Sequence, residues 1–263
     1  MSLKLLLTLL DDVATESGTS QPLIVGGLVR DRVLGNLQKS FNDIDITTGD
    51  KTVFNLAASY AMELRKQMPI LVKNTRPRDH APEDPGHISI YLKDFKIDFS
   101  SNFRTPNIVQ ILQIMGIENP TEMKQELYSR DFFCNTLLMS LDFKRVKDIT
   151  GQGIKDLENK IIRTCLTPNL TFKYNTNRII RVVYLAAKLG FDVDPKIIEW
   201  IKHNPEYIMQ SEKSYLSKNI NKALSLDADR AVYLINKMNM WKFIPITEAL
   251  VPYYSKIMSK RIL

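Results

Sequence analysis

The sequence predicts an α+β fold, in which a small mixed-sheet head is followed by an all-helical neck and body. Two patterns predict this fold. Over about the first hundred residues, short apolar or alternating segments typical of strands mix with helical segments. From about residue 107 onward, apolar residues recur at spacings of three and four, which is typical of helices. The 263 residues suffice for one large domain or for two to three small ones.

The first predicted element is an amphipathic helix within "MSLKLLLTLLDDVA". Its apolar run is short, Lys4 and Thr8 interrupt it, and two aspartates follow without a small-residue cleavage site, so we do not interpret it as a signal peptide. No segment of the sequence approaches the length that a bilayer span requires. The sequence therefore predicts no membrane partner.

The next segment, "PLIVGGLVRDRVLG", reads as a strand, a glycine turn and a short helix closed by Gly35. Backbone N–H groups at the start of a helix attract anions, and Gly26 and Gly27 allow a ligand to approach the backbone closely. Arg30 can add a charged donor, which would suit a triphosphate. The later glycine and the Lys-Ser/Thr pair of a Walker loop are absent. On this turn alone, a phosphate site and a plain tight turn stay equally open.

The strand "NDIDIT" carries Asp43 and Asp45 on one face and directs Ile44 and Ile46 into a core. Taken alone, the stretch favours a solvated strand face, because D-x-D occurs often by chance. A phosphate-binding turn on the preceding strand changes this interpretation. Together the two features predict a two-metal nucleotidyl-transfer site, which clamps the attacking and leaving oxygens of an in-line displacement.

The rest of the head is predicted from residues 51–101. "KTVFNLAASYAMELRKQ" is expected to be a helix with one apolar face, made of Val53, Leu56, Ala57, Tyr60 and Leu64. A strand at "ILVK" precedes a charged, Pro-rich loop over residues 74–86, and "HISIYLKDFKIDFSS" reads as a hairpin that turns near Lys93. Asp98 lies on the polar face of this hairpin. It is either a third carboxylate beside Asp43 and Asp45, if the strands are neighbours, or a solvated strand residue.

The predicted helical part contains four clear segments, with Gly190 as a helix stop. They are "PTEMKQELYSRDFFCNTLLMSL", "IKDLENKIIRT", "NTNRIIRVVYLAAKLG" and "KIIEWIKHN". Further helices follow, separated by Pro205, Pro245 and Pro252.

The charge of the chain and its cysteines indicate the class of binding partner and the cellular compartment. The net charge of +7 and the pI near 9.2 favour a polyanionic partner. From Lys202 onward there are ten Lys or Arg against five Asp or Glu, so we expect this part of the chain to face the polyanion. Cys134, Cys165 and the scattered histidines make neither a disulfide framework nor a zinc spacing, and a cytoplasmic location is expected.

The order of the motifs resembles the class II tRNA nucleotidyltransferase and bacterial poly(A) polymerase family. The family's first signature is similar to "GGLVRDRVLG…NDIDITT". Its R-D-F-T-x-N-A segment, its D-x-T-G-G…D-L…I-R segment and its E-D-x-x-R-x-x-R-x-x-R-F-A-A-x-L-G-F helix are similar, in the same order, to "RDFFCNTLLMSL", "DITGQGIKDLENKIIRT" and "NTNRIIRVVYLAAKLGF". These four motifs cover roughly residues 22–191.

The resemblance implies a division of the chain and a set of roles. It implies a nucleotidyltransferase head over residues 1–115, a helical neck that recognises the base over 116–191, and a helical body with a shortened tail that binds RNA over 192–263. Asp43 and Asp45 would bind two Mg²⁺ ions, with Asp98 as a possible third catalytic carboxylate. The nucleotide-binding residues it implies are Gly26, Gly27, Arg30, Arg130, Asp131, Asn135, Asn175, Arg178 and Arg181. A helix N-terminal ion pair stays open as a second role for Arg130 and Asp131.

This sequence departs from the family pattern mainly in the fourth motif. Tyr174 and Asn175 stand where the family has an acidic pair, and Tyr184 stands where it usually has a third arginine. Ser129 replaces another arginine and Gln152 replaces a glycine. An asparagine still offers an acceptor and a donor to a base but lacks the strength of a charged carboxylate. These changes bear on nucleotide choice more than on catalysis.

The resemblance implies a template-independent RNA nucleotidyltransferase that adds CCA, or part of it, to tRNA 3′ ends from CTP and ATP with Mg²⁺. The altered fourth motif and the short tail keep a second activity open, that of a poly(A) polymerase or an A-only or C-only adding enzyme acting on other RNA. A catalytically inactive RNA-binding relative, or a transferase acting on small molecules or proteins, fits less well. The paired aspartates argue against the former, and the helical motifs with the basic C-terminal third argue against the latter. The sequence leaves the oligomeric state open.

Overall fold

A computed structural model describes residues 2–36, 43–75, 87–93, 95–99 and 104–254. The chain divides into two compact units, an N-terminal unit of Met1–Leu157 and a C-terminal unit of Glu158–Leu263. The division into parts at residues 115 and 191 stays a prediction. Within the described residues, none of the helices combines the length and the hydropathy that a bilayer crossing requires. The expected cytoplasmic location also stays a prediction.

The N-terminal unit is built around a mixed seven-stranded sheet with the strand order β3-β4-β5-β2-β1-β6-β7. Neighbouring strands are antiparallel except β2 and β5, which are parallel. The strands are β1 (Leu23–Val25), β2 (Asp43–Thr47), β3 (Leu71–Thr75), β4 (His87–Tyr91), β5 (Lys96–Phe99), β6 (Leu138–Met139) and β7 (Val146–Lys147). The helices are α1 (Leu3–Glu16), α2 (Gly27–Val33), α3 (Thr52–Gln67), α4 (Ile108–Ile114), α5 (Glu122–Tyr128), the 3-10 turn η1 (Phe133–Asn135) and α6 (Gly153–Glu158).

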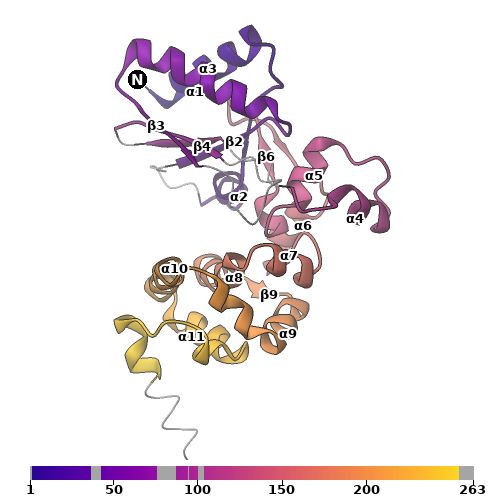
Figure 1. The fold of residues 1–263 in the computed structure, drawn as a ribbon, viewed down its shortest axis with the longest axis vertical. Coiled ribbons are helices and arrows are strands. Elements are labelled where there is room, and N and C mark those ends of the chain that lie inside the picture. Colours follow the sequence, from indigo (N-terminus) through magenta and orange to yellow (C-terminus); the bar gives the residue numbers. More distant parts are fainter. Residues whose placement is uncertain (1, 37–42, 76–86, 94, 100–103, 255–263) are drawn as a thin grey trace, which may run out of the picture. The chain divides into compact units, whose positions relative to one another are not determined.

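Two helices cover one face of this sheet, and the opposite face combines polar side chains with a small buried cluster of Val25, Leu127 and Leu138. Figure 1 shows α1 and α3 on one side of the sheet and α2 on the other. The apolar face predicted for the helix at residues 51–67 is confirmed, since all five of its predicted members are buried in α3. The Tyr60 hydroxyl donates to the Leu6 carbonyl at 2.8 Å and so joins α3 to α1. Ile44 and Ile46 are buried as predicted, which directs Asp43 and Asp45 to the opposite face.

The hairpin prediction is also confirmed, because β4 and β5 pair antiparallel and the Leu92 amide donates to the Phe95 carbonyl at 2.8 Å. Most of the predicted loop over residues 74–86 lies outside the described residues, as do Asp94 and the end of the hairpin segment beyond Phe99.

Two predicted helices are wrong over their second halves. The segment at residues 120–141 is helical only in α5, after which η1 and the strand β6 follow, and β6 pairs with β1. The segment at residues 154–164 is helical only in α6 and continues into β8 (Ile161–Ile162), which pairs with β9 (Asp192–Val193). In both cases the strand partner lies far away in the sequence, so the local helical spacing of apolar residues was misleading.

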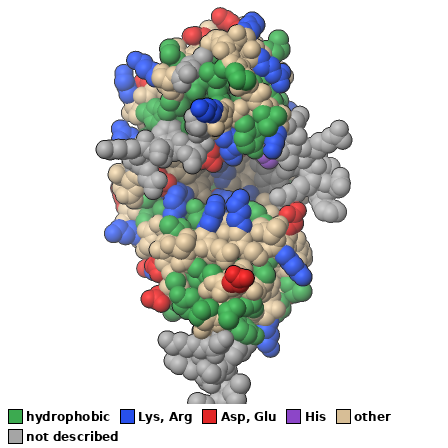
Figure 2. Space-filling view, turned by 90° about the vertical axis from the view of Figure 1, so that its left-hand side faces the viewer, with side chains coloured by type: hydrophobic (Ala, Val, Ile, Leu, Met, Phe, Trp, Pro, Cys, Tyr) green, Lys and Arg blue, Asp and Glu red, His purple; other side chains and the backbone are tan. Residues whose placement is uncertain are grey.

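The C-terminal unit is a helical assembly in which α8 packs against α7, α10 and α11. Its helices are α7 (Pro168–Tyr174), α8 (Asn177–Leu189), α9 (Pro195–His203), η2 (Pro205–Gln210), α10 (Lys213–Leu226), α11 (Ala228–Lys237), η3 (Met240–Lys242) and η4 (Glu248–Leu250). Gly190 ends α8 with a left-handed φ of 67°, which confirms the predicted helix stop. Figure 2 shows a row of Lys and Arg side chains on one face of this unit.

Candidate active site

The structure brings the three predicted carboxylates onto two neighbouring strands. In the parallel pair of β2 and β5, Asp45 is the register partner of Asp98, and Asp43 is the partner of Lys96. Paired residues of neighbouring strands point to the same face of a sheet, so all four side chains lie on the face opposite α3. The sequence left open whether the strand of Asp98 neighbours the strand of Asp43 and Asp45, and the structure shows that it does. The catalytic role of each carboxylate stays a prediction.

Lys96 is a residue of this site that sequence reasoning missed. Its ammonium pairs with the Asp98 carboxylate and lies 3.9 Å from Oδ2 of Asp43. Ser89 on β4 donates to the other Asp98 oxygen at 2.6 Å. Burial lowers the pKa of Lys96, but the hydrogen bond and the charge of Asp98 outweigh burial and raise that pKa above its ordinary value. Lys96 is therefore a resident cation among the three acids.

Asp45 is the carboxylate of this face whose ionised form is disfavoured by its surroundings. Burial raises the pKa of Asp45 from 3.8 to about 6, the positive charge of Arg130 opposes the shift, and the negative charges of Asp98 and Asp43 add to it. A carboxylate that is desolvated and flanked by like charges gains from a cation. The electrostatics of this face therefore favour binding of a cation at Asp45.

The glycine turn stands directly beside Asp45. Gly26 has φ 89° and ψ −142°, a conformation that is open almost only to glycine, and α2 begins at the next residue. A Cβ at Gly26 would lie 3.0 Å from Oδ2 of Asp45 and 3.7 Å from Nη1 of Arg130. The bare Cα of Gly26 therefore allows the carboxylate and the guanidinium to meet at the start of the helix.

Arg30 lies behind this turn rather than on an open surface. It is 3% exposed, and its guanidinium donates to Oδ1 of Asp31 at 2.8 Å and to Oδ1 of Asn135 at 2.8 Å. Asn135 in turn donates to Oδ1 of Asp131 at 3.0 Å, and the same oxygen accepts from the Phe132 amide. These contacts join α2 to the segment that contains η1. Direct binding of a triphosphate by Arg30, Asp131 or Asn135 stays a prediction.

Arg130 is held by a carboxylate that sequence reasoning also missed. Its Nη2 donates to Oε1 of Glu126 at 3.1 Å, and Oε2 of Glu126 accepts from the Thr47 hydroxyl at 2.6 Å. Glu126 is 2% exposed, and Thr47, which lies two residues after Asp45 on β2, is fully buried. The spacing of four residues between Glu126 and Arg130 was the available sequence signal, because such pairs face each other on helices.

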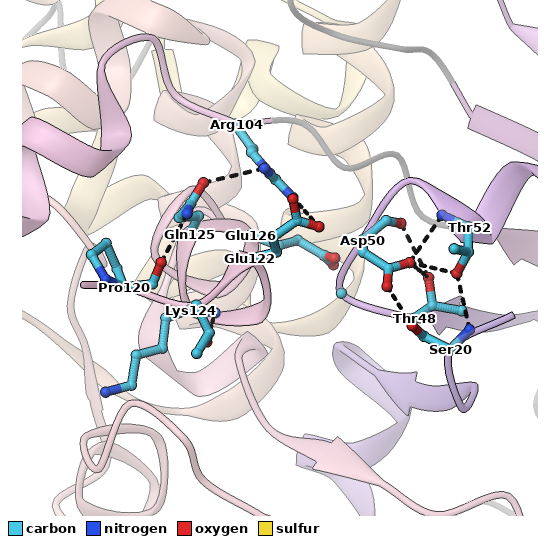
Figure 3. Close-up of polar contacts among 12 residues, drawn as sticks. Ser20, Thr48, Asp50, Thr52, Arg104, Pro120, Glu122, Lys124, Gln125 and Glu126 are labelled. Carbon is cyan, nitrogen blue, oxygen red and sulfur yellow. Dashed lines mark hydrogen bonds and ion pairs between the residues drawn. The ribbon is translucent and has the colours of Figure 1, made fainter.

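The loop after β2 is fixed by a second polar cluster. Figure 3 shows Asp50 surrounded by Ser20, Thr48 and Thr52, and the Thr52 amide donates to Oδ1 of Asp50 at 2.9 Å. Burial raises the pKa of Asp50, but hydrogen bonds from Ser20 and Thr52 outweigh burial and lower that pKa below its ordinary value. Asp50 is therefore an anionic acceptor that holds the loop after β2 to Ser20 and to the start of α3.

The residues predicted to read the base lie in the C-terminal unit. Asn175 follows α7, and its Oδ1 accepts from the Asn177 amide at 3.2 Å at the start of α8. Arg178 is buried and Arg181 is half-buried on the same helix. The acceptor of Asn175 is thus engaged in the first turn of α8, while its amide group is a donor. The roles of these three residues stay predictions.

The carboxylates fit Mg²⁺ that arrives with a nucleotide better than a preformed metal cage. Across the described ranges, His, Cys, Asp and Glu do not gather in groups of three or more that could hold an ion. Asp45 and Asp98 are nevertheless register partners, and Mg²⁺ in nucleotide sites takes one or two carboxylates, water and substrate phosphates. The raised pKa of Asp45 is the observation that a cation would relieve.

The sheet, the glycine turn and the paired carboxylates define a nucleotidyltransferase-type head. A family model described as the poly(A) polymerase head domain matches residues 23–163. The chain belongs to this family.

Comparison with known proteins agrees with this membership. The chain is 26% identical over 248 residues to the tRNA nucleotidyltransferase cca2 of Schizosaccharomyces pombe, which covers 89% of this chain and 50% of the relative. A structure of a tRNA nucleotidyltransferase complexed with a primer tRNA and an incoming ATP analog is 26% identical, with a TM-score of 0.63 and coverage of 89% of this chain and 62% of that chain. The Bacillus stearothermophilus CCA-adding enzyme in complex with CTP, 21% identical with a TM-score of 0.67 and coverage of 93% and 55%, shares the fold. The chain spans about half the length of the curated relatives it matches.

Proposed function

We propose that this chain is a template-independent RNA nucleotidyltransferase that adds CCA, or part of it, to tRNA 3′ ends from CTP and ATP with Mg²⁺. The observation that carries the proposal is the register pair of Asp45 and Asp98 on β2 and β5, beside the Gly26 turn at the start of α2. Carboxylates beside a helix start that can receive an anion support the proposal, because two-metal phosphoryl transfer needs acidic metal ligands close to the phosphates. The names of the relatives, tRNA nucleotidyltransferases, support the choice of substrate.

The proposed mechanism assigns each group one task. When bound, Mg²⁺ would lower the pKa of the RNA 3′-hydroxyl and stabilise the pyrophosphate leaving group. Asp43 and Asp45 would hold the ions, and Asp98, oriented by Ser89, would complete the acidic face. The backbone N–H groups at Gly26 and Gly27 would receive the triphosphate. Arg130, whose Nη1 lies near Gly26, would neutralise phosphate charge.

The test is single-nucleotide incorporation on defined RNA ends. The protein is incubated with tRNA ending before CCA, with tRNA ending in CC, and with oligo(A), each with one labelled nucleoside triphosphate. Incorporation of CTP and then ATP on tRNA supports the proposal. Asp43→Ala and Asp45→Ala should each abolish Mg²⁺-dependent incorporation while the circular dichroism spectrum stays that of the wild type. Substantial turnover in either variant would contradict the assignment of the metal ligands.

A second candidate, addition of A alone, of C alone or of a poly(A) tail, is favoured by the contacts of Asn175. Its Oδ1 accepts from the Asn177 amide, so the acceptor that a carboxylate would offer to a base is engaged. Long A-tails on any RNA, or incorporation that stops after one kind of nucleotide, would favour this candidate. Asn175→Asp keeps the helix contact and adds a second acceptor, so it should sharpen the choice between CTP and ATP. Unchanged selectivity would contradict a role of this position in base recognition.

A further inference from the structure

We infer that Glu126 is a positioning residue that holds the Arg130 guanidinium at the triphosphate turn. The inference rests on the proposed function, because it concerns how the same site receives a nucleotide. In this role, the buried Glu126 side chain on α5 orients Arg130 toward the phosphate end of the substrate. Glu126 itself does not contact the substrate in this assignment.

The first observation is that the Glu126 carboxylate is buried and that both of its oxygens are engaged. Glu126 is 2% exposed, and a buried carboxylate is costly unless each oxygen has a partner. Oε2 accepts from the Thr47 hydroxyl at 2.6 Å and Oε1 accepts from Nη2 of Arg130 at 3.1 Å. One carboxylate therefore bridges the end of the strand that carries Asp43 and Asp45 and the guanidinium of Arg130.

The second observation is the orientation that the contact with Glu126 gives to the Arg130 guanidinium. Glu126 binds the Nη2 side of Arg130, whereas Nη1 lies 3.7 Å from the position of a Cβ at Gly26. Oδ2 of Asp45 lies 3.0 Å from that same position. A planar guanidinium that is fixed at one nitrogen keeps a defined orientation at the other. Arg130 thus presents a fixed cationic edge where the helix start and the acidic strand converge.

The third observation is that α5, which carries Glu126, is itself anchored on its other side. Nη1 of Arg104 donates to Gln125 at 3.2 Å, and its Nη2 lies 3.3 Å from the Glu122 carboxylate. The Ser129 hydroxyl accepts from the Thr105 amide at 2.8 Å. In Figure 3, Glu126 lies between the Arg104 contacts and the loop that contains Asp50. These contacts hold α5 in place, so Glu126 on this helix can hold Arg130 in a defined position.

The charge of Glu126 is the property that matters in this arrangement. A glutamine at this position keeps the shape and can still accept from Thr47, but its contact with Arg130 loses the strength of a charged pair. The guanidinium then has only weaker restraints against turning toward other anions of the site. Outer partners that orient metal ligands typically contribute about tenfold to a hundredfold to affinity or activity, and we expect a partner that orients a guanidinium to act at the lower end of that range.

The test compares binding of ATP and of adenosine, without RNA, by titration calorimetry on the full chain. Glu126→Gln should weaken ATP binding roughly tenfold and leave adenosine binding unchanged, because only ATP carries phosphates. In an Arg130→Met background, the same substitution should have no further effect on ATP binding. Glu118→Gln, which removes an exposed carboxylate from the segment before α5, is the matched control and should leave both affinities unchanged.

Several outcomes would overturn the inference. They are equal weakening of ATP and adenosine binding by Glu126→Gln, additive effects of the Glu126 and Arg130 substitutions, or wild-type ATP affinity in the Glu126→Gln variant. Thr47→Val, which removes the strand end of the bridge together with the acceptor of the Gly49 amide, is a second variant and should also weaken ATP binding more than adenosine binding. If the wild-type protein binds ATP but incorporates no nucleotide into RNA, the proposed function fails while the binding comparison still decides the role of Glu126.

Discussion

At the scale of single residues, Asp43 and Asp45 share a strand face but differ in environment. The Asp43 side chain is 65% exposed, so water solvates its charge, whereas burial raises the pKa of Asp45 to about 6. A carboxyl whose pKa is higher in the folded protein than in the unfolded chain favours folding most below pH 3.8. That contribution is lost as the pH rises through 6. The ionised Asp45 of the metal-free protein therefore costs stability at neutral pH.

We expect Asp45→Asn to stabilise the metal-free protein at pH 7.5 but hardly at pH 4. The difference between 3.8 and about 6 corresponds to about 3 kcal/mol of unfolding free energy, gained between these two pH values. Denaturant unfolding in the presence of EDTA, at a series of pH values, measures this quantity. Asp43→Asn is the control and should gain much less, because its carboxylate is solvated. A gain by Asp45→Asn that does not vary with pH would contradict the assigned environment.

Lys96 leads to a second prediction at this scale. Its ammonium occupies the acidic face that a divalent cation would enter, and like charges repel. Lys96→Met should therefore tighten Mn²⁺ binding in the absence of nucleotide, by roughly threefold to tenfold given partial exposure of the site. Calorimetric titration with Mn²⁺ measures the affinity. Lys73→Met makes the same charge change on β3, two strands away from the strand of Lys96, and should leave Mn²⁺ affinity unaltered.

Individual residues also show which features of the site could be predicted from the sequence. The alternation of β2 predicted the burial of Ile44 and Ile46 and hence the face of the two aspartates. The pairing of Asp45 with Asp98 depended on a parallel strand contact between distant segments, so the sequence could state it only as a condition. The spacing of four residues between Glu126 and Arg130 was a local signal, but the contact that ties Glu126 to β2 joins it to Thr47, 79 residues away. A local pattern contains no information about such a contact.

At the scale of elements, long periodic segments were predicted well, whereas the two-residue strands β6 and β8 were not. The helix α3 has sixteen residues and one continuous apolar face, so its period is unambiguous. The strands β6 and β8 have two residues each, which is too few for any period to be recognised. Pairing with β1 and β9 decides their conformation, and such pairing is a property of the folded chain.

The glycine turn between β1 and α2 is the element whose conformation bears most directly on the site. Gly26→Ala should destabilise the fold by roughly 1–3 kcal/mol through its backbone conformation. It should also abolish most nucleotide incorporation, because the new Cβ lies 3.0 Å from the Asp45 carboxylate. Thermal unfolding and a single-nucleotide incorporation assay measure the two effects.

Gly35→Ala is the matched control for this turn. Gly35 has φ 73°, and a Cβ there meets no atom within 4 Å. It should therefore show a comparable loss of stability with incorporation close to that of the wild type. Equal losses of activity in the two variants would mean that backbone strain, and not the approach to Asp45, explains the effect at Gly26.

At the scale of the whole molecule, the two units divide the predicted tasks. The acidic face and the glycine turn belong to the N-terminal unit, whereas the excess of basic residues from Lys202 onward belongs to the C-terminal unit. On α10, Lys218 and Lys222 are exposed and four residues apart, so they share a face. The Lys222 ammonium lies 6.0 Å from the ring centroid of Tyr184 on α8. Lys222 therefore lies beside Tyr184, three residues along α8 from Arg181, and Lys218 shares its face of α10.

We expect the double variant Lys218→Ala, Lys222→Ala to weaken tRNA binding and to reduce its salt dependence. Each lysine that neutralises a phosphate contributes about 0.7 to 0.9 to the slope of log affinity against log salt, so the slope should fall by about one to two. Filter binding at several salt concentrations measures it. Lys196→Ala, Lys202→Ala removes the same charge from α9, which packs on α7, and should change the slope less. None of these four lysines is among the residues predicted to bind the nucleotide, so neither double variant should alter ATP binding without RNA. Equal slopes in the two variants would show that only net charge guides the RNA.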